Sequence, residues 1–198
     1  MGWLALAIFV LGSVLTFGLR ILIHRRRTGD TGLRLGNSPT WATVLFGLAP
    51  VFMAAGPVAA IAGLDALPPL DRPAIAGIGL VLAVAGTVGA TLAQAAMGAS
   101  WRFGIDPSER TDLVMAGAFR VVRNPVYAAV LVISLGLALM VPNVVSLISL
   151  AVVVLAVQVQ VRAVEEPHLT RTHGAAYTAY AAQVGRFVPG VGTGRPPS

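Results

Sequence analysis

Long hydrophobic runs separated by short polar segments dominate this sequence. The runs that carry no charge, or almost none, are Gly2 to Leu19, Trp41 to Leu64, Ala74 to Met97, Val126 to Val141 and Val144 to Val161. About 20 apolar residues are enough to cross the hydrocarbon core of a bilayer as a helix. We therefore interpret the runs as about five transmembrane helices. The pattern predicts an all-α fold, a polytopic membrane helix bundle.

Within the runs, prolines that kink a helix and small residues that let helices approach closely predict how the spans pack. Pro50 and Pro57 are expected to kink the second span, which neighbouring helices in a bundle can tolerate. In the third span, small residues recur at helical spacing and form a seam for close helix contact. The seam consists of Gly79, Ala83, Gly86 and Ala90. Pro142-Asn143 separates the last two runs and predicts a tight helical hairpin.

Composition and charge support a membrane location. The chain is 56% hydrophobic and 11% charged, whereas soluble domains carry about 25% charged residues. All fourteen basic residues are arginines, and the net charge is +6. In the five-span topology every arginine except Arg72 falls on one side, as the positive-inside rule requires. This distribution favours topology signals over nucleic-acid binding. It predicts an inner-membrane protein with its N-terminus outside and its C-terminus and active site in the cytoplasm.

The sequence also predicts structure at the end of the first span and in the C-terminal segment of the chain. Arg20 is expected to snorkel to the interface, just before the basic cluster His24 to Arg27. His168 to Val184 is expected to form one amphipathic helix on the cytoplasmic side, and residues 190–198 a disordered tail. One face of that helix should hold Leu169, Ala176, Tyr177, Tyr180 and Val184. Residues 1–97 thus form three N-terminal spans, and residues 98–189 a second region built on the hairpin 126–161.

Polar residues gather where the hairpin returns to the cytoplasmic side. A tight hairpin places Arg123 opposite Glu165 and Glu166, across a small pocket. Such a pocket suits a zwitterionic ligand, and an ion-pair network that only fixes helix ends is the alternative. Adjacent residues on a helix lie about 100° apart, so one of the two glutamates is expected to face the pocket. The chain has no cysteine, and its histidines lack companions at metal-ligand spacing, so no metal site is predicted.

Two blocks of residues on either side of this hairpin resemble a known family. The first block is Leu113-Val114, Gly117, Phe119 and Arg123-Asn124-Pro125-Val126-Tyr127. The second is Glu165-Glu166, Leu169, Gly174, Tyr177, Tyr180 and Arg186-Phe187-Val188-Pro189. In this order and spacing they resemble the isoprenylcysteine carboxyl methyltransferase family, which is related to phospholipid methyltransferases. The resemblance covers roughly residues 94–189. Asn124 stands where that family has a histidine, so a titrating imidazole is excluded there.

The resemblance implies an S-adenosylmethionine-dependent membrane methyltransferase. Its acceptor would be lipophilic, such as an isoprenylcysteine-like carboxylate or another small lipid or thiol, reached from the membrane between the second, third and fourth spans. Arg123, Tyr127 and Glu166 would be catalytic. The cofactor would be lined by Leu113, Val114, Gly117, Arg123, Asn124, Pro125, Tyr127, Glu165, Glu166, Tyr177, Tyr180 and Arg186. The alternatives are an NADPH-dependent reductase of the sterol-reductase type, which would need an arginine cluster for phosphate, and a non-catalytic membrane scaffold.

Overall fold

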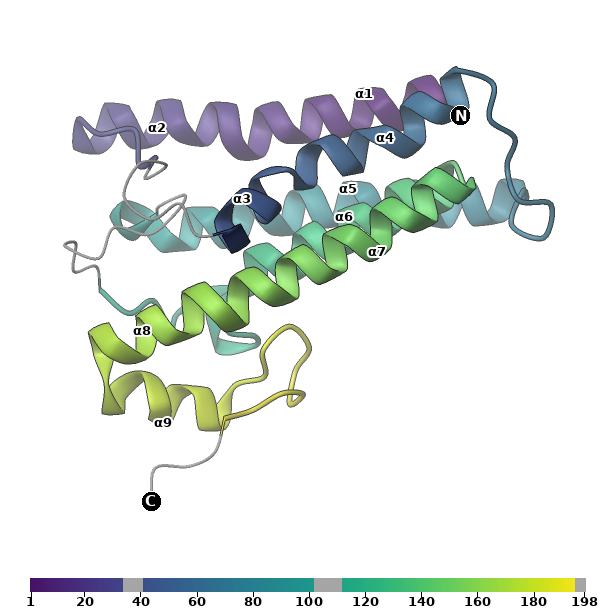
Figure 1. Ribbon diagram of the computed structural model, residues 1–198. Helices are drawn as coiled ribbons and strands as arrows, with labels where there is room; N and C mark the ends of the chain where they lie inside the picture. The colour runs from purple at the N-terminus through teal and green to yellow at the C-terminus, as the bar shows by residue number, and fades with distance from the viewer. Residues whose placement is uncertain (34–40, 102–111, 195–198) are drawn as a thin grey trace.

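The structure is a computed structural model of the chain, and it describes residues 1–33, 41–101 and 112–194. Within these ranges the elements are helices joined by short loops, together with two isolated β-bridges (Figure 1). The fold is therefore all-α, as predicted. The predicted polar segment Ser100 to Arg110 lies outside the described residues from Arg102 onward.

The first span is one continuous helical stretch of 27 residues, Gly2–Thr28. It consists of α1 (Gly2–Ser13), a π-helical turn η1 (Val14–Gly18) and α2 (Leu19–Thr28). Arg20, near the end of this stretch, is only 7% exposed. Its Nη2 donates to the carbonyl of Gly98 at 2.6 Å, and its guanidinium lies 5.4 Å from the centre of the Trp101 ring. Arg20 therefore binds the C-terminal end of the third span.

The second span is broken near its first proline. α3 (Trp41–Gly47) ends before Leu48, and α4 (Ala49–Ile61) begins with Pro50 in its first turn and contains Pro57 in its interior. A proline ring in the first turn occupies a position whose N–H needs no intrahelical partner, so a new helix starts there. Trp41 is exposed at the start of α3, and tryptophans at the ends of spans are typical of membrane interfaces.

The small-residue seam brings the third and fourth spans into backbone contact. α5 (Pro73–Met97) packs along α6 (Pro125–Met140). A Cβ added at Gly79 would lie 2.6 Å from the carbonyl oxygen of Gly136, and one added at Gly136 would lie 2.5 Å from the nitrogen of Ala83. All four predicted seam residues are buried. The seam therefore serves packing within one chain.

The predicted hairpin turns at Pro142-Asn143. Asn143 caps α7 (Val144–Val159), because its side chain accepts from the N–H of Ser146 at 2.9 Å. The same side chain donates to the carbonyl of Gly56 in α4 at 3.0 Å. The Pro142 carbonyl accepts from the N–H of Leu67 at 2.8 Å. The turn is therefore bound to the second span and to the loop that follows it.

The fifth span runs further than the sequence predicted. α7 continues through a π-helical turn η4 (Gln160–Glu165) into α8 (Glu166–His173), which gives one 30-residue stretch from Val144 to His173. The amphipathic helix predicted from His168 to Val184 is therefore wrong as a single helix. The chain turns at Gly174, whose φ of +52° favours glycine, and α9 (Ala175–Gln183) folds back. Ala176, assigned to the apolar face, is exposed.

Four described stretches are long and apolar enough to cross a membrane: Gly2–Thr28, Val44–Ile61, Pro73–Met97 and Val144–His173. The remaining predicted span, the fourth, is α6, a shorter apolar helix of 16 residues. Figure 1 shows the arginine-rich end of α2 at the same end of the bundle as α8 and α9. The chain N-terminus, the α4–α5 loop and the α6–α7 turn lie at the other end. The protein is therefore an integral membrane helix bundle.

The close approach of α5 and α6 predicts that one methyl group added at their contact lowers the stability of the protein. Gly79→Ala places its Cβ against the backbone of α6, and overpacking of this kind costs about 1–3 kcal/mol. We expect a lower melting temperature of the detergent-purified protein. Gly77→Ala is the matched control on the same helix, because a Cβ there meets nothing within 4 Å. Equal melting temperatures for the two variants would contradict the backbone contact.

Candidate active site

The two sequence blocks meet through their backbones where α6 begins. Val122 and Gly185 form a parallel β-bridge. The N–H of Arg123 donates to the Gly185 carbonyl at 2.8 Å, and the N–H of Asn124 donates to the Arg186 carbonyl at 3.1 Å. These bonds hold the start of the fourth span against the segment that follows α9. Residues about 60 positions apart are thus fixed side by side.

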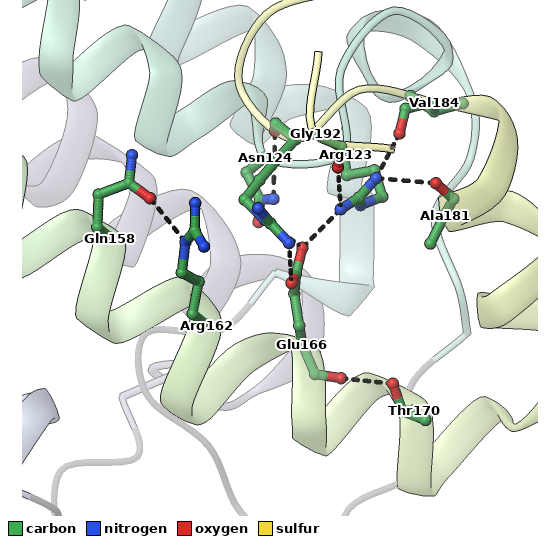
Figure 2. A network of polar contacts seen from close by, with 10 residues as sticks. Arg123, Asn124, Gln158, Arg162, Glu166, Thr170, Ala181, Val184 and Gly192 are labelled. Atoms are coloured by element: carbon green, nitrogen blue, oxygen red, sulfur yellow. Dashed lines mark hydrogen bonds and ion pairs between the residues drawn. The ribbon is translucent and has the colours of Figure 1, made fainter. Parts of the chain in front are cut away.

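Arg123 is the centre of the polar network (Figure 2). Its Nη1 donates to the carbonyls of Ala181, at 3.0 Å, and Val184. Its Nη2 donates to the Gly192 carbonyl at 3.1 Å and to Glu166 Oε1 at 2.8 Å. The side chain is only 2% exposed, and its Nε has no partner within the described residues. Arg123 therefore joins α6, α8, α9 and the loop after α9.

Glu166 accepts hydrogen bonds from two arginines. In addition to Arg123, Arg186 donates from Nε to Oε1 at 2.8 Å and from Nη2 to Oε2 at 2.9 Å. Such a two-pronged pair fixes both distance and orientation. The hydrogen bond to Glu166 raises the pKa of Arg186, which lies outside the spans. The expected pairing of Arg123 with a glutamate is thus made by Glu166.

Glu165 points to a different set of partners. Its Oε1 accepts from the Tyr127 hydroxyl at 2.8 Å and from Gln160 Nε2 at 3.3 Å. Gln160 Oε1 is buried with no partner among the described residues. The Tyr127 ring lies edge-on to Phe46 of α3, with ring centres 5.1 Å apart. The two adjacent glutamates therefore serve two separate polar clusters.

The π-helical turn explains how both glutamates stay on one helix. The N–H of Glu166 bonds to the Val161 carbonyl, five residues back, and Pro167 follows with no N–H to donate. Because the turn is wider than an α-helical turn, the helix passes the proline ring without ending. An α-helix of about 20 residues spans the bilayer core, so a helix that starts at Val144 reaches Glu165 and Glu166 where the core ends.

The tyrosines of α9 form the apolar base of the site. Tyr177, Tyr180 and Ala181 are buried together, and Leu113, Leu169 and Val184 pack against them. The Tyr180 hydroxyl donates to the Phe119 carbonyl at 2.6 Å. Burial, helped by the negative charge of Glu166, raises the pKa of Tyr177 to about 12. Burial likewise raises the pKa of Tyr180 to about 12, against the opposing charge of Arg123.

The remaining predicted site residues lie around this network. Asn124 donates from Nδ2 to the Arg186 carbonyl at 3.3 Å and precedes Pro125, the first residue of α6. Gly117 has a φ of +59° at the start of η3 (Gly117–Arg120), and Val114 is half-buried in the preceding segment. The structure thus brings most predicted site residues to one end of the bundle, whereas Tyr127 and Glu165 lie in the second cluster.

Several groups in the network were not predicted from sequence. Three of Arg123's partners are backbone carbonyls, which leave no residue-type signal. The segment from Gly190 to Gly194, expected to be disordered, folds against the site, since the Gly194 N–H donates to the Ala181 carbonyl at 2.7 Å. Residues 195–198 lie outside the described ranges. Gln160 could have been noticed as a polar residue within an apolar run.

A cavity of about 190 Å³ adjoins this end of the bundle. It is enclosed by the first span, α3, α4, α5 and α6. Val126, from the first sequence block, lines it, and so does Phe46, the aromatic partner of Tyr127. Its walls are largely apolar, and they include the second, third and fourth spans, as expected. The cavity therefore lies among the spans, and Val126 connects it to the first sequence block.

Comparison with known proteins agrees with this architecture. Residues 75–176, just over half of the chain, match the phospholipid methyltransferase family. A solved structure described as the eukaryotic intramembrane Ras methyltransferase, isoprenylcysteine carboxyl methyltransferase, is similar with a TM-score of 0.66 and 19% sequence identity. The similarity covers 95% of this chain and 66% of that one. No curated protein matches the sequence.

The spans and the family match together identify an integral membrane protein of a methyltransferase family. The chain belongs to the phospholipid methyltransferase family. At this level of identity the likeness to the solved structure shows a shared helical architecture. Family membership favours a methyltransferase over the reductase and scaffold alternatives.

The ion-pair network predicts that replacing the Glu166 carboxylate with an amide strongly destabilises the folded protein. Glu166→Gln leaves two arginines beside a neutral amide, and removal of one partner from a buried pair costs about 3–5 kcal/mol. Glu166 is 16% exposed, so we expect the lower end of this range, read as a lower melting temperature. Arg162→Gln is the control, since its 3.0 Å bond to Gln158 is exposed (Figure 2). Equal stability of both variants would contradict the network.

The two tyrosines outside the spans predict a fall in stability at alkaline pH. Their pKa values are about 12 in the folded protein and about 10 in the unfolded chain, so the unfolded state loses its protons first. Their stabilising contribution is complete below pH 10 and is lost between pH 10 and pH 12. The phenolate absorbance of Tyr177→Phe and Tyr180→Phe, compared with the parent, checks this. A midpoint near 10 for either tyrosine in the folded protein would refute it.

Proposed function

We propose that the protein transfers a methyl group from S-adenosylmethionine to a lipophilic acceptor that enters from the membrane. The observation that carries this proposal is that one short segment, Arg123 to Val126, reaches both the polar network and the apolar cavity. Val126 belongs to the sequence block that forms the network and also lines the cavity. Cofactor and acceptor would thus meet at the membrane boundary, where the closed bundle excludes water.

The chemistry of the site fits this cofactor. S-adenosylmethionine carries an ammonium, a carboxylate and hydroxyl groups, and when bound it supplies a methyl group already activated on a sulfonium. Arg123 Nε is a buried donor and Gln160 Oε1 a buried acceptor, both without partners among the described residues. Asn124, beside Arg123, offers a further polar side chain. Leu113, Val114, Gly117 and Pro125 would place backbone against the nucleoside, and Tyr177 and Tyr180 would close the site.

The geometry separates positioning residues from reactive ones. Arg123 and Arg186 are bound to Glu166 and to backbone carbonyls, so we assign these three residues to holding the site in shape. Among the described residues no arginine bonds to Glu165, which accepts hydrogen bonds from Tyr127 and Gln160. A carboxylate or thiolate acceptor needs no base. For a hydroxyl or amine acceptor, Glu165 would take the proton through Tyr127.

The membrane orientation is part of the proposal. The arginine-rich end of α2 lies at the end of the bundle that carries the site (Figure 1). By the positive-inside rule this end faces the cytoplasm, in the inner membrane of the cell, with the N-terminus outside. Cytoplasmic S-adenosylmethionine would then reach the site directly, while the acceptor would come from surrounding membrane lipid.

Calorimetric titration of the detergent-purified protein with S-adenosylhomocysteine tests the proposal, with NADPH titrated in parallel. We expect saturable binding of S-adenosylhomocysteine alone. If NADPH alone bound, or if neither bound to a folded sample, the proposal would be rejected.

The role of Glu165 gives a separate prediction. We expect Glu165→Gln to retain S-adenosylhomocysteine binding, because its partners lie outside the Arg123 network. Transfer of labelled methyl from S-adenosylmethionine to lipid-extractable products should fall by about 10²-fold or more if the acceptor is a hydroxyl or amine. An unchanged rate would show that the acceptor needs no base, as a carboxylate or thiolate does. Tyr127→Phe should have the same effect as Glu165→Gln on the rate.

A further inference from the structure

Gln94 is a polar side chain inside the apolar cavity. It lies one turn before the end of α5, is only 2% exposed, and lines the cavity wall. Its side chain makes no hydrogen bond to any residue in the described ranges. The hydroxyls of Thr16 and Thr87, which line the same cavity, donate to carbonyls of their own helices at 2.7 and 2.9 Å. The amide of Gln94 therefore remains available inside the cavity.

An unpaired amide in such a place is uncommon. Folded proteins give nearly all buried polar groups a hydrogen-bond partner, because leaving one unpaired forfeits its hydration. Gln94 keeps both a carbonyl acceptor and two N–H donors. Apart from Ser13, the other side chains that line the cavity are apolar or, like Thr16 and Thr87, already bonded, so a molecule in the cavity is the partner that the site offers to Gln94.

We propose that Gln94 binds a polar group on the lipophilic acceptor and thereby selects which acceptors the enzyme takes. This rests on the proposed function. The described residues that line the cavity are all uncharged. A charged group there would lose its hydration without gaining a counterion. The group that Gln94 recognises is therefore neutral, such as a hydroxyl, a ketone, an ester or an amide.

The size of the cavity limits the part of the acceptor that it holds. A cavity of about 150 Å³ binds benzene, which has six carbons. By proportion, 190 Å³ holds roughly seven or eight non-hydrogen atoms. Longer chains would extend into the lipid between the helices. The first span shapes this space through its π-helical turn, which places Thr16 and Phe17 in the wall.

The cavity end near Gln94 lies close to the polar site. Ala96, two residues further along α5, is the nearest neighbour of Gly117, at 3.4 Å from a Cβ built there. Val126 lines the same cavity one residue after Pro125. A polar group bound to Gln94 would hold the acceptor beside the reacting end of the site.

Photolabelling of the full-length protein in lipid nanodiscs tests this inference. The probes are 3-azioctanol, an eight-carbon alcohol with a diazirine, and 3-azioctane, the matched hydrocarbon. Labelled cavity peptides are quantified by mass spectrometry. We expect the alcohol to label them about fivefold more than the hydrocarbon, the ratio produced by one net hydrogen bond. Gln94→Leu should abolish this ratio. Gln183→Leu, the same change at an exposed position of α9, should retain it.

A second measurement separates recognition from packing. Without ligand, Gln94→Leu should melt at the same or a higher temperature than the parent, because it removes an unpaired buried amide. A lower melting temperature, equal labelling by both probes in the parent, or an alcohol preference that survives in Gln94→Leu would overturn the proposal. S-adenosylhomocysteine titration of the same nanodiscs reports on the proposed function independently. Its failure alongside a normal alcohol preference would reject only the methyl-transfer role.

Discussion

The structure depends on the guanidinium of Arg123. It is almost fully buried and bonds to three backbone carbonyls and to Glu166. A buried arginine cannot lose its charge, so these acceptors must be in place for the fold to form. They come from α8, α9 and the loop that follows α9, which makes those segments a single unit with the start of α6. The segments that form the candidate site are held together by their bonds to this one cation.

The unit sits at the membrane boundary because of the length of one helix. The stretch from Val144 to His173 is longer than the bilayer core requires, and its π-helical turn carries Glu165 and Glu166 to the core edge. Glu166 completes the arginine network, whereas Glu165 joins Tyr127 and Gln160 nearer the cavity. One helix thus supplies a carboxylate to each of the two polar clusters.

Features with a residue-type signature were predictable from the sequence. The hydrophobic runs marked the spans, Gly79 and its neighbours marked the α5–α6 contact, and Pro142-Asn143 marked the hairpin. Features that arise from the backbone were not. The hydrophobic run ended at Val161, but the π-helical turn carries the helix on to His173. Likewise, the sequence marked Arg20 as a charge near a span end but gave no sign that the carbonyl of Gly98 binds it. The function of the collected site residues stays a prediction.

The coupling between Arg123 and Glu166 is the central claim of this account. The most direct test is a double-mutant cycle read by calorimetric affinity for S-adenosylhomocysteine, with Arg123→Met, Glu166→Gln and the double variant. If the pair holds the cofactor site in shape, each single change weakens binding and the double variant binds no more weakly than the weaker single one. Full affinity in either single variant, or losses that simply add, would contradict it.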